Sequence, residues 1–153
     1  MFSCGGFVSL TAVRTVVDAV AEYGRTHVLH LGDSDPSGYS IFQSFAEDVD
    51  EFLARECRRG EFTAERVALT LDQMEAWDIT GERITTEDER SKAWLAAGIT
   101  HKAELEVLAP DDIARLLTRA IERHVDADIL AEARAQQDAD RSDLVARADR
   151  AAE

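Results

Sequence analysis

The sequence predicts an α/β protein with a central, mostly parallel sheet of about four strands and helices on both faces. Segments with apolar residues at helical spacing alternate with short apolar runs that are typical of buried strands. Two of these runs lead directly into residues that begin helices. The length of 153 residues suits one domain with a sizeable core, and we expect this domain over residues 1–130.

The first part of the chain reads helix, strand, helix. Ser9 is expected to cap a helix that runs to about residue 23, with valines on one face and Gly24 as its stop. A buried strand follows over residues 27–31. The next helix begins at Pro36, and its apolar residues recur at helical spacing until Gly60 ends the region. The core side chains expected from the two helices are Val13, Val16, Val17, Val20, Ile41, Phe42, Phe45, Val49, Phe52 and Leu53.

The middle of the chain reads strand, helix, loop, helix. Residues 66–69 form a second short apolar run, and residues 70–73 have the form of a capping box that opens a short helix. Residues 78–91 are polar and typical of a loop. A short helix over residues 91–97 then stops at Gly98.

The last part adds a strand, a helix and a tail. Residues 104–108 alternate polar and apolar side chains, as a half-exposed strand does. Pro110 begins a longer helix with an apolar face. Residues 131–153 are rich in charged residues and alanine, and we expect a solvated helix or a frayed end. The side chains expected to point inward from the helix at Pro110 are Ile113, Leu116, Leu117, Ala120 and Ile121.

The charge of the chain limits its partners. The formal net charge of −14 argues against tight unaided binding to nucleic acid, because that affinity comes largely from cationic side chains on phosphates. A divalent ion held by carboxylates would partly reverse the sign of the charge around it.

The apolar runs and the cysteines indicate the cellular compartment of the protein. No apolar run is long enough to span a membrane, and the first residues lack the pattern of a signal peptide. Cys4 and Cys57 show neither the spacing of a zinc site nor a disulfide framework. We therefore expect a cytoplasmic protein without a membrane partner.

The clearest chemical signal is an acidic turn after the first expected strand. Asp33 and Asp35 are spaced i, i+2 where that strand meets a helix N-terminus, which is where α/β sheets bind ligands. Two carboxylates at this spacing can face one Mg²⁺ ion, held weakly because the ion keeps most of its waters. Gly32 and Gly38 would let the backbone bend closely around it. In a purely structural interpretation, Asp35 is the N-cap before Pro36 and Asp33 only solvates the turn.

Four segments together resemble Toprim domains. Residues 31–38, Leu-Gly-Asp-Ser-Asp-Pro-Ser-Gly, resemble the acidic DxD turn of the subset found in type IIB topoisomerase A subunits, meiotic double-strand-break proteins and their bacterial and phage relatives. Residues 66–73, 86–90 and 104–110 resemble later segments of the same subset, in the same order. The resemblance covers residues 5–130.

The resemblance implies a Rossmann-like sheet with a Mg²⁺ site at its strand ends. Asp33 and Asp35 match the metal-binding DxD, Glu106 matches a later acidic position, and Glu104 is an additional acidic group. The family has a further glutamate after its first strand, where this chain has Cys4, so the sequence is a fragment, has a truncated start or carries a degenerate site. The family's tyrosine-bearing cleavage domain has no counterpart here.

These features leave three hypotheses. The first is a Mg²⁺-binding, nucleic-acid-processing domain of the DNA topoisomerase or nuclease kind, working with other protein subunits or domains. The second is a Toprim-derived interaction or scaffold module without metal. The third rests on the triplet Gly32-Asp33-Ser34, which resembles the nucleophile block of SGNH hydrolases. That chemistry needs an aspartate three residues before a histidine, and neither His101 nor His124 has one.

Overall fold

The computed structural model describes residues 10–56, 59–85 and 88–151 of the chain. By its internal contacts the chain divides into two compact units, Met1–Leu117 and Thr118–Glu153. The expected cap at Ser9, both cysteines and the residue pair 86–87 lie outside the described residues. Expectations that concern those positions stay predictions.

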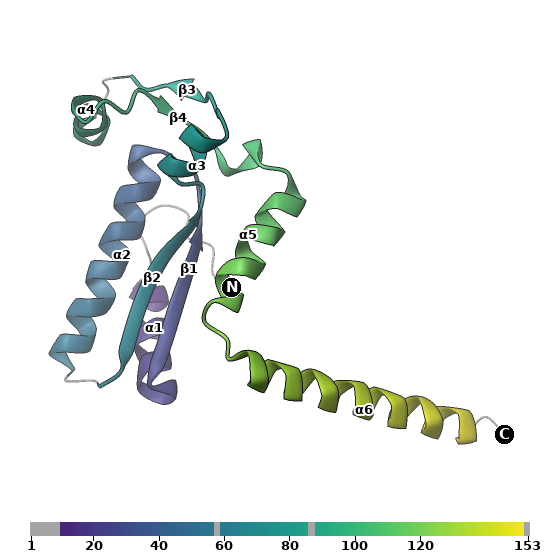
Figure 1. The fold of residues 1–153 in the computed structure, drawn as a ribbon. Coiled ribbons are helices and arrows are strands. Elements are labelled where there is room, and N and C mark those ends of the chain that lie inside the picture. Colours follow the sequence, from purple (N-terminus) through teal and green to yellow (C-terminus); the bar gives the residue numbers. More distant parts are fainter. Residues whose placement is uncertain (1–9, 57–58, 86–87, 152–153) are drawn as a thin grey trace. The chain divides into compact units, whose positions relative to one another are not determined.

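Two parallel strands form the centre of the first unit (Figure 1). Strand β1 (Arg25–Leu31) pairs with β2 (Glu61–Ala68), and α2 (Pro36–Arg55) makes the crossover that a parallel pair requires. The register shifts between His30 and Leu31, because β2 carries one additional residue, Val67, between the partners of these two residues. Such an irregularity bends the strand that carries the extra residue, which here is β2 at its carboxyl end.

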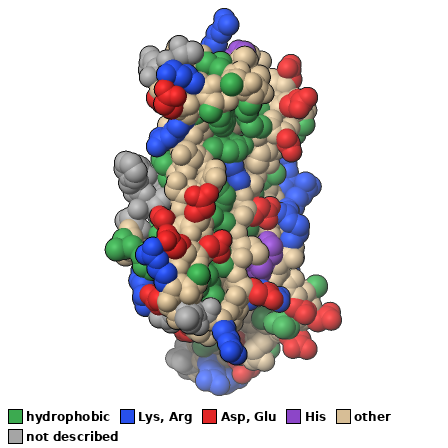
Figure 2. Space-filling view, turned by 90° about the vertical axis from the view of Figure 1, so that its left-hand side faces the viewer, with side chains coloured by type: hydrophobic (Ala, Val, Ile, Leu, Met, Phe, Trp, Pro, Cys, Tyr) green, Lys and Arg blue, Asp and Glu red, His purple; other side chains and the backbone are tan. Residues whose placement is uncertain are grey.

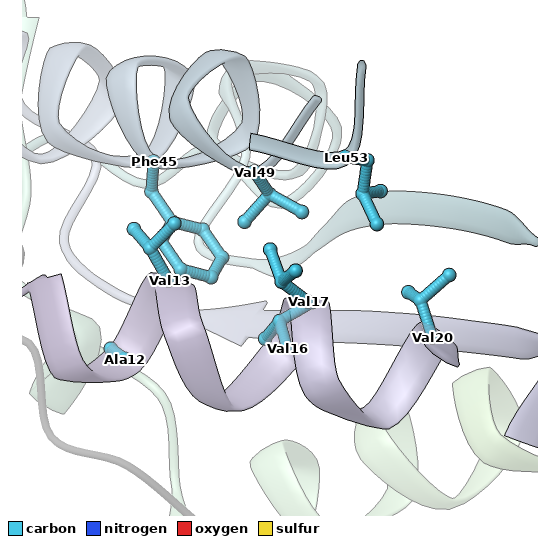
Figure 3. Close-up of a cluster of buried hydrophobic side chains, with 8 residues drawn as sticks. All are labelled: Ala12, Val13, Val16, Val17, Val20, Phe45, Val49 and Leu53. Atoms are coloured by element: carbon cyan, nitrogen blue, oxygen red, sulfur yellow. The ribbon is translucent and has the colours of Figure 1, made fainter. Parts of the chain in front are cut away.

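The main core lies between α1 (Leu10–Tyr23) and α2, as the apolar spacing predicts. Figure 3 shows Phe45, Val49 and Leu53 of α2 reaching toward the valines of α1. Val28 and Phe62 of the two strands pack against the same cluster, so both helices cover one face of the sheet. The fully buried members, with no exposed side-chain surface, are Val17, Val20 and Val49.

A second apolar cluster lies beyond the carboxyl ends of the strands. It contains Ala68, Leu69 and Leu108, and partly buried Leu31 packs against it. The elements that follow β2 in the chain are α3 (Leu71–Ala76), β3 (Glu82–Arg83), α4 (Glu89–Ala96), β4 (His101–Lys102), the 3₁₀ turn η1 (Leu105–Val107) and α5 (Pro110–Glu122).

The sheet differs from the predicted one. The four described strands form two separate two-stranded sheets, and β3 pairs with β4 in antiparallel fashion. The chain is therefore mixed α/β, but the described residues do not form one parallel sheet of four strands. Residues 82–83 were expected in a loop, and the pairing that makes them a strand comes from residues about twenty positions away.

The predicted strand over residues 104–108 is wrong. Residues 105–107 form a 3₁₀ turn, in which the N–H of Leu108 donates to the carbonyl of Leu105 at 3.1 Å. Leu105 and Leu108 both contact the second cluster, and positions three apart share a side of a 3₁₀ turn. The three-residue separation of the two leucines, rather than the polar–apolar alternation, therefore determines the secondary structure of this segment.

Local end signals place the helices well. The capping box predicted at residues 70–73 forms between Thr70 and Gln73 and opens α3. Gly24 and Gly98 follow α1 and α4 with φ of +75° and +83°, a region that favours glycine. Helix α4 begins at Glu89, two residues before the expected start, because the carboxylate of Asp88 accepts from the N–H of Ser91 and caps it.

The charged tail, for which a solvated helix or a frayed end was expected, is helical. Helix α6 spans Ala127–Ala151, and its apolar residues Ile129 and Leu144 are 65% and 66% exposed. The expectation that Ile121 points inward is wrong, since it is 45% exposed, while Ile113 and Leu116 make the contacts of α5 with the second cluster. Among the helices of the described ranges, none has the length and apolarity to cross a membrane.

Candidate functional site

The acidic turn begins where strand β1 ends, as predicted. Strand β1 stops at Leu31, and Asp33 lies two residues later. The N–H of Gly32 donates to the carbonyl of Ala68 at 2.8 Å, and the N–H of Leu69 donates back to Gly32 at 2.7 Å. These two bonds continue the β1–β2 pairing, so the turn starts from a fixed point of the sheet.

Asp33 connects the turn to a segment far along the chain. One oxygen of its carboxylate accepts a hydrogen bond from the N–H of Leu105 at 2.8 Å. Next to it, Ser34 and Ala103 exchange two backbone hydrogen bonds, at 2.8 and 3.0 Å. These backbone bonds hold the segment that contains Glu104 and Glu106 next to Asp33. Among the described residues, however, no three metal-binding side chains converge.

Asp35 is the N-cap of α2. Its backbone is extended, with φ of −136° and ψ of 161°, and its carboxylate accepts from the N–H of Gly38. Pro36 occupies the first turn, as predicted. The structural interpretation of Asp35 is therefore correct, but it accounts for only one of the roughly four lone-pair sites of the carboxylate.

Close neighbours within the protein favour glycine at both positions of the turn. A Cβ on Gly32 would lie 2.7 Å from Cε1 of the His30 ring, and a Cβ on Gly38 would lie 3.0 Å from the carbonyl oxygen of Asp33 and 3.1 Å from the carboxylate of Asp35. A larger residue would push on the His30 ring at position 32 and on the acidic turn at position 38. Whether the same close approach also serves an ion stays a prediction.

Arg66 holds the turn and was not singled out from the sequence. Its guanidinium donates to the carbonyls of Gly32 at 2.9 Å and Leu69 at 3.0 Å, and also to that of Asp33. The group lies 4.0 Å from the centre of the Tyr39 ring, within the range of a cation–π contact. A charged residue inside the otherwise apolar run 66–69 was the signal that could have identified it.

The positive charge of Arg66 is placed beside the acidic turn. Burial lowers the pKa of Arg66, while Tyr39 and the carboxylates of Asp35 and Asp33 act in the opposite direction. The guanidinium remains charged at neutral pH because an arginine pKa starts far above 7. The turn therefore carries an internal cation that offsets part of its negative charge.

His30 completes the buried side of the site. Its ring stacks on Phe42 with 4.3 Å between ring centres and 13° between planes, and its Nδ1 lies 3.3 Å from Arg66. Burial, and then the charge of Arg66, lower the pKa of His30 to about 4. The ring is therefore neutral near pH 7 and accepts the hydrogen bond from the guanidinium.

Ser34 does not have the surroundings of a nucleophile. The residue is fully buried, and its hydroxyl has no hydrogen-bond partner among the described residues. A nucleophilic serine needs an activating base and access to a substrate. The geometry gives the hydrolase hypothesis no support.

The surface above α2 carries mixed charge. In the face that Figure 2 presents, Lys and Arg side chains lie among Asp and Glu side chains rather than in one basic patch. Such a surface does not by itself attract a polyanion strongly. Comparison of the chain with protein-family models, with curated proteins and with solved structures found no match.

Proposed function

We propose that this chain is a Toprim-like module that binds Mg²⁺ at Asp33 and Asp35 and acts on nucleic acid together with other subunits or domains. One observation carries the proposal. The two carboxylates follow the carboxyl end of a parallel strand pair, and Asp33 is hydrogen-bonded to the 3₁₀ turn that contains the third acidic candidate, Glu106. Residues 72 positions apart are thus joined at one acidic edge.

The donor set fits a hard cation. Each of the two carboxylates uses one oxygen for a backbone N–H, which leaves acceptor capacity for an ion or for its water ligands. Oxygen ligands in small number are what Mg²⁺ takes when it retains several waters. Bound there, the ion would neutralise phosphate charge and polarise a phosphodiester.

The protein's own part is to position these oxygens. The bond from Leu105 fixes the carboxylate of Asp33, and the cap at Gly38 fixes that of Asp35. Arg66 fixes the backbone on both sides of Asp33 through the carbonyls of Gly32 and Asp33. Weak binding is expected, because the guanidinium opposes the approach of another cation.

A Mn²⁺ titration followed by paramagnetic broadening of NMR signals tests this function. The signals of residues 32–38 should broaden first, and the double variant Asp33→Asn, Asp35→Asn should abolish the effect. Asp138 and Asp140 offer a matched control, because they share the i, i+2 spacing on exposed helix α6. Their double Asn variant should leave the broadening unchanged, whereas equal broadening along α6 in the wild type would contradict a specific site.

A second candidate function has its own observation. Both carboxylates already accept backbone hydrogen bonds, and Arg66 already supplies a cation beside them. These features favour a metal-free interaction or scaffold module. Retained folding with no Mn²⁺ effect at residues 32–38 would support this second function over the first.

A further inference from the structure

A small polar cavity lies where helices α2 and α4 begin. Figure 1 places α4, β3 and β4 at the N-terminal end of α2. The cavity between them has a volume of about 140 Å³. We call it the α2–α4 cavity, and its lining residues are Asp35, Pro36, Ser37, Ile84, Thr85, Asp88, Ser91 and Lys102.

The α2–α4 cavity presents both donors and acceptors. Lys102 contributes an ammonium group, and three hydroxyls come from Ser37, Thr85 and Ser91. Each of the two carboxylates accepts a backbone hydrogen bond as a helix cap, Asp35 from the N–H of Gly38 and Asp88 from the N–H of Ser91 at 2.7 Å, and keeps further acceptor capacity. An ammonium with several hydroxyls is a donor set that recognises an anion where the charge of such carboxylates is offset.

The walls of the cavity are fixed relative to the acidic turn. Lys102 directly precedes Ala103, whose backbone is paired with that of Ser34. On the other side, Trp94 of α4 meets Tyr39 of α2 edge to face with ring centres 5.1 Å apart. Asp35 belongs both to the cavity and to the proposed metal site, so an anion in the cavity would lie beside the ion.

The size of the cavity and the weak ion pair of Lys102 are compatible with a phosphate group as the anion. The volume of about 140 Å³ is several times the roughly 10–15 Å³ that one water needs, which leaves room for one phosphate. The existing partner of Lys102 is Glu82, with 3.5 Å between Nζ and the nearest carboxylate oxygen. Exposed pairs of this kind contribute little stability, so the ammonium can turn to a bound phosphate at small cost.

We propose that the α2–α4 cavity binds a phosphate group of the nucleic acid, with Lys102 as its counter-ion and Ser37, Thr85 and Ser91 as hydroxyl donors. The proposal rests on the function proposed above, because a divalent ion at Asp35 would offset the charge of the two cap carboxylates. Phosphate should therefore bind more tightly with Mg²⁺ than in EDTA.

The test is an NMR titration of the full chain with inorganic phosphate, with a trinucleotide and with the corresponding nucleosides, which carry no phosphate. With Mg²⁺ present, the signals of residues 37, 85, 91 and 102 should shift with both phosphate-containing probes at lower concentration than with the nucleosides. A preference for the trinucleotide over inorganic phosphate would identify nucleic acid as the source of the group.

The chain has two lysines, which gives a matched pair of variants. Lys102→Met should weaken binding about tenfold, as loss of a charged hydrogen bond does. Lys92→Met removes the same charge from an exposed ion pair with Glu89 and should leave binding within about twofold. Ser91→Ala, which keeps the backbone N–H that Asp88 caps, should weaken binding by a smaller factor.

The outcomes separate this proposal from the proposed function. Equal weakening by Lys102→Met and Lys92→Met would overturn the cavity, since only net charge would matter. Mn²⁺ broadening at residues 32–38 without phosphate shifts in the cavity would also overturn it and leave the metal site standing. Phosphate shifts in the cavity without any Mn²⁺ effect would overturn the metal-binding function, and with it the expected dependence of phosphate binding on Mg²⁺, and would leave the phosphate contacts of Lys102 standing.

Discussion

Replacing Asp35 by Asn separates its two roles, because the change keeps an oxygen acceptor and removes a charge. The carboxylate caps α2, a helix of 20 residues, by accepting from the N–H of Gly38. Asparagine caps helices about as well as aspartate, so Asp35→Asn should retain this bond. Asp35→Ala loses it and should lower the free energy of unfolding by about 1 kcal/mol.

The charge itself has two opposing neighbours. The like charge of Asp33, two residues away, destabilises an ionised Asp35, whereas the guanidinium of Arg66 favours it. Because the two effects have opposite sign and the turn is partly exposed, they should nearly cancel. Without Mg²⁺, the free energy of unfolding of Asp35→Asn should therefore lie within about 0.5 kcal/mol of the wild type.

Added Mg²⁺ should then distinguish the two proteins. At ten times the dissociation constant, an ion that binds only the folded state adds about 1.4 kcal/mol to the free energy of unfolding. For a chain of this length, this corresponds to a rise in Tm of about 3–6 °C. Thermal and urea unfolding at constant ionic strength should show this gain in the wild type and in the control Asp140→Asn, but not in Asp35→Asn.

Three results would refute this reasoning. An equal gain in Asp35→Asn would mean that Asp35 does not bind the ion. No gain in any of the proteins would favour the metal-free scaffold. Without Mg²⁺, Asp35→Asn could also prove more stable than the wild type by about 1 kcal/mol or more, which is about twice the expected margin. That result would show that Arg66 does not offset the charge of Asp33.

The buried side of the site makes two further predictions. Arg66→Met should lower the free energy of unfolding by about 2–4 kcal/mol, because three carbonyls lose a charged donor. As a control in the same urea assay, Arg83→Met on exposed β3 should change the free energy of unfolding little. Similar effects of the two variants would contradict the role of Arg66. Folding lowers the pKa of His30 from 6.5 to about 4, so the unfolded chain binds more protons between these values and stability falls as the pH drops from 6.5 toward 4. Allowing for the partial exposure of the ring, His30 should account for roughly 1–2 kcal/mol of that fall. Urea unfolding at pH 7 and pH 4.5 should show a smaller fall for His30→Gln than for the wild type, and parallel curves would contradict this assignment.

Features that depend on neighbouring residues could be predicted from the sequence. The cap at Asp35, the capping box at Thr70 and the end of α1 at Gly24 each use hydrogen bonds or backbone angles within about four residues. The valines of α1 and the apolar residues of α2 likewise predict the main core, because helical spacing places them on one face. Local chemistry therefore identified the acidic turn and its position after β1.

Features that depend on distant residues required the tertiary structure. The fixed orientation of Asp33 comes from Leu105, and the cation at the turn comes from Arg66 on the neighbouring strand. The same limit explains the error at residues 104–108, where packing of Leu105 and Leu108 against the second cluster outweighs a strand-like alternation. The sequence by itself determined which residues could carry chemistry here. Tertiary packing decided which of them meet, because contacts between segments far apart in the chain leave no local pattern.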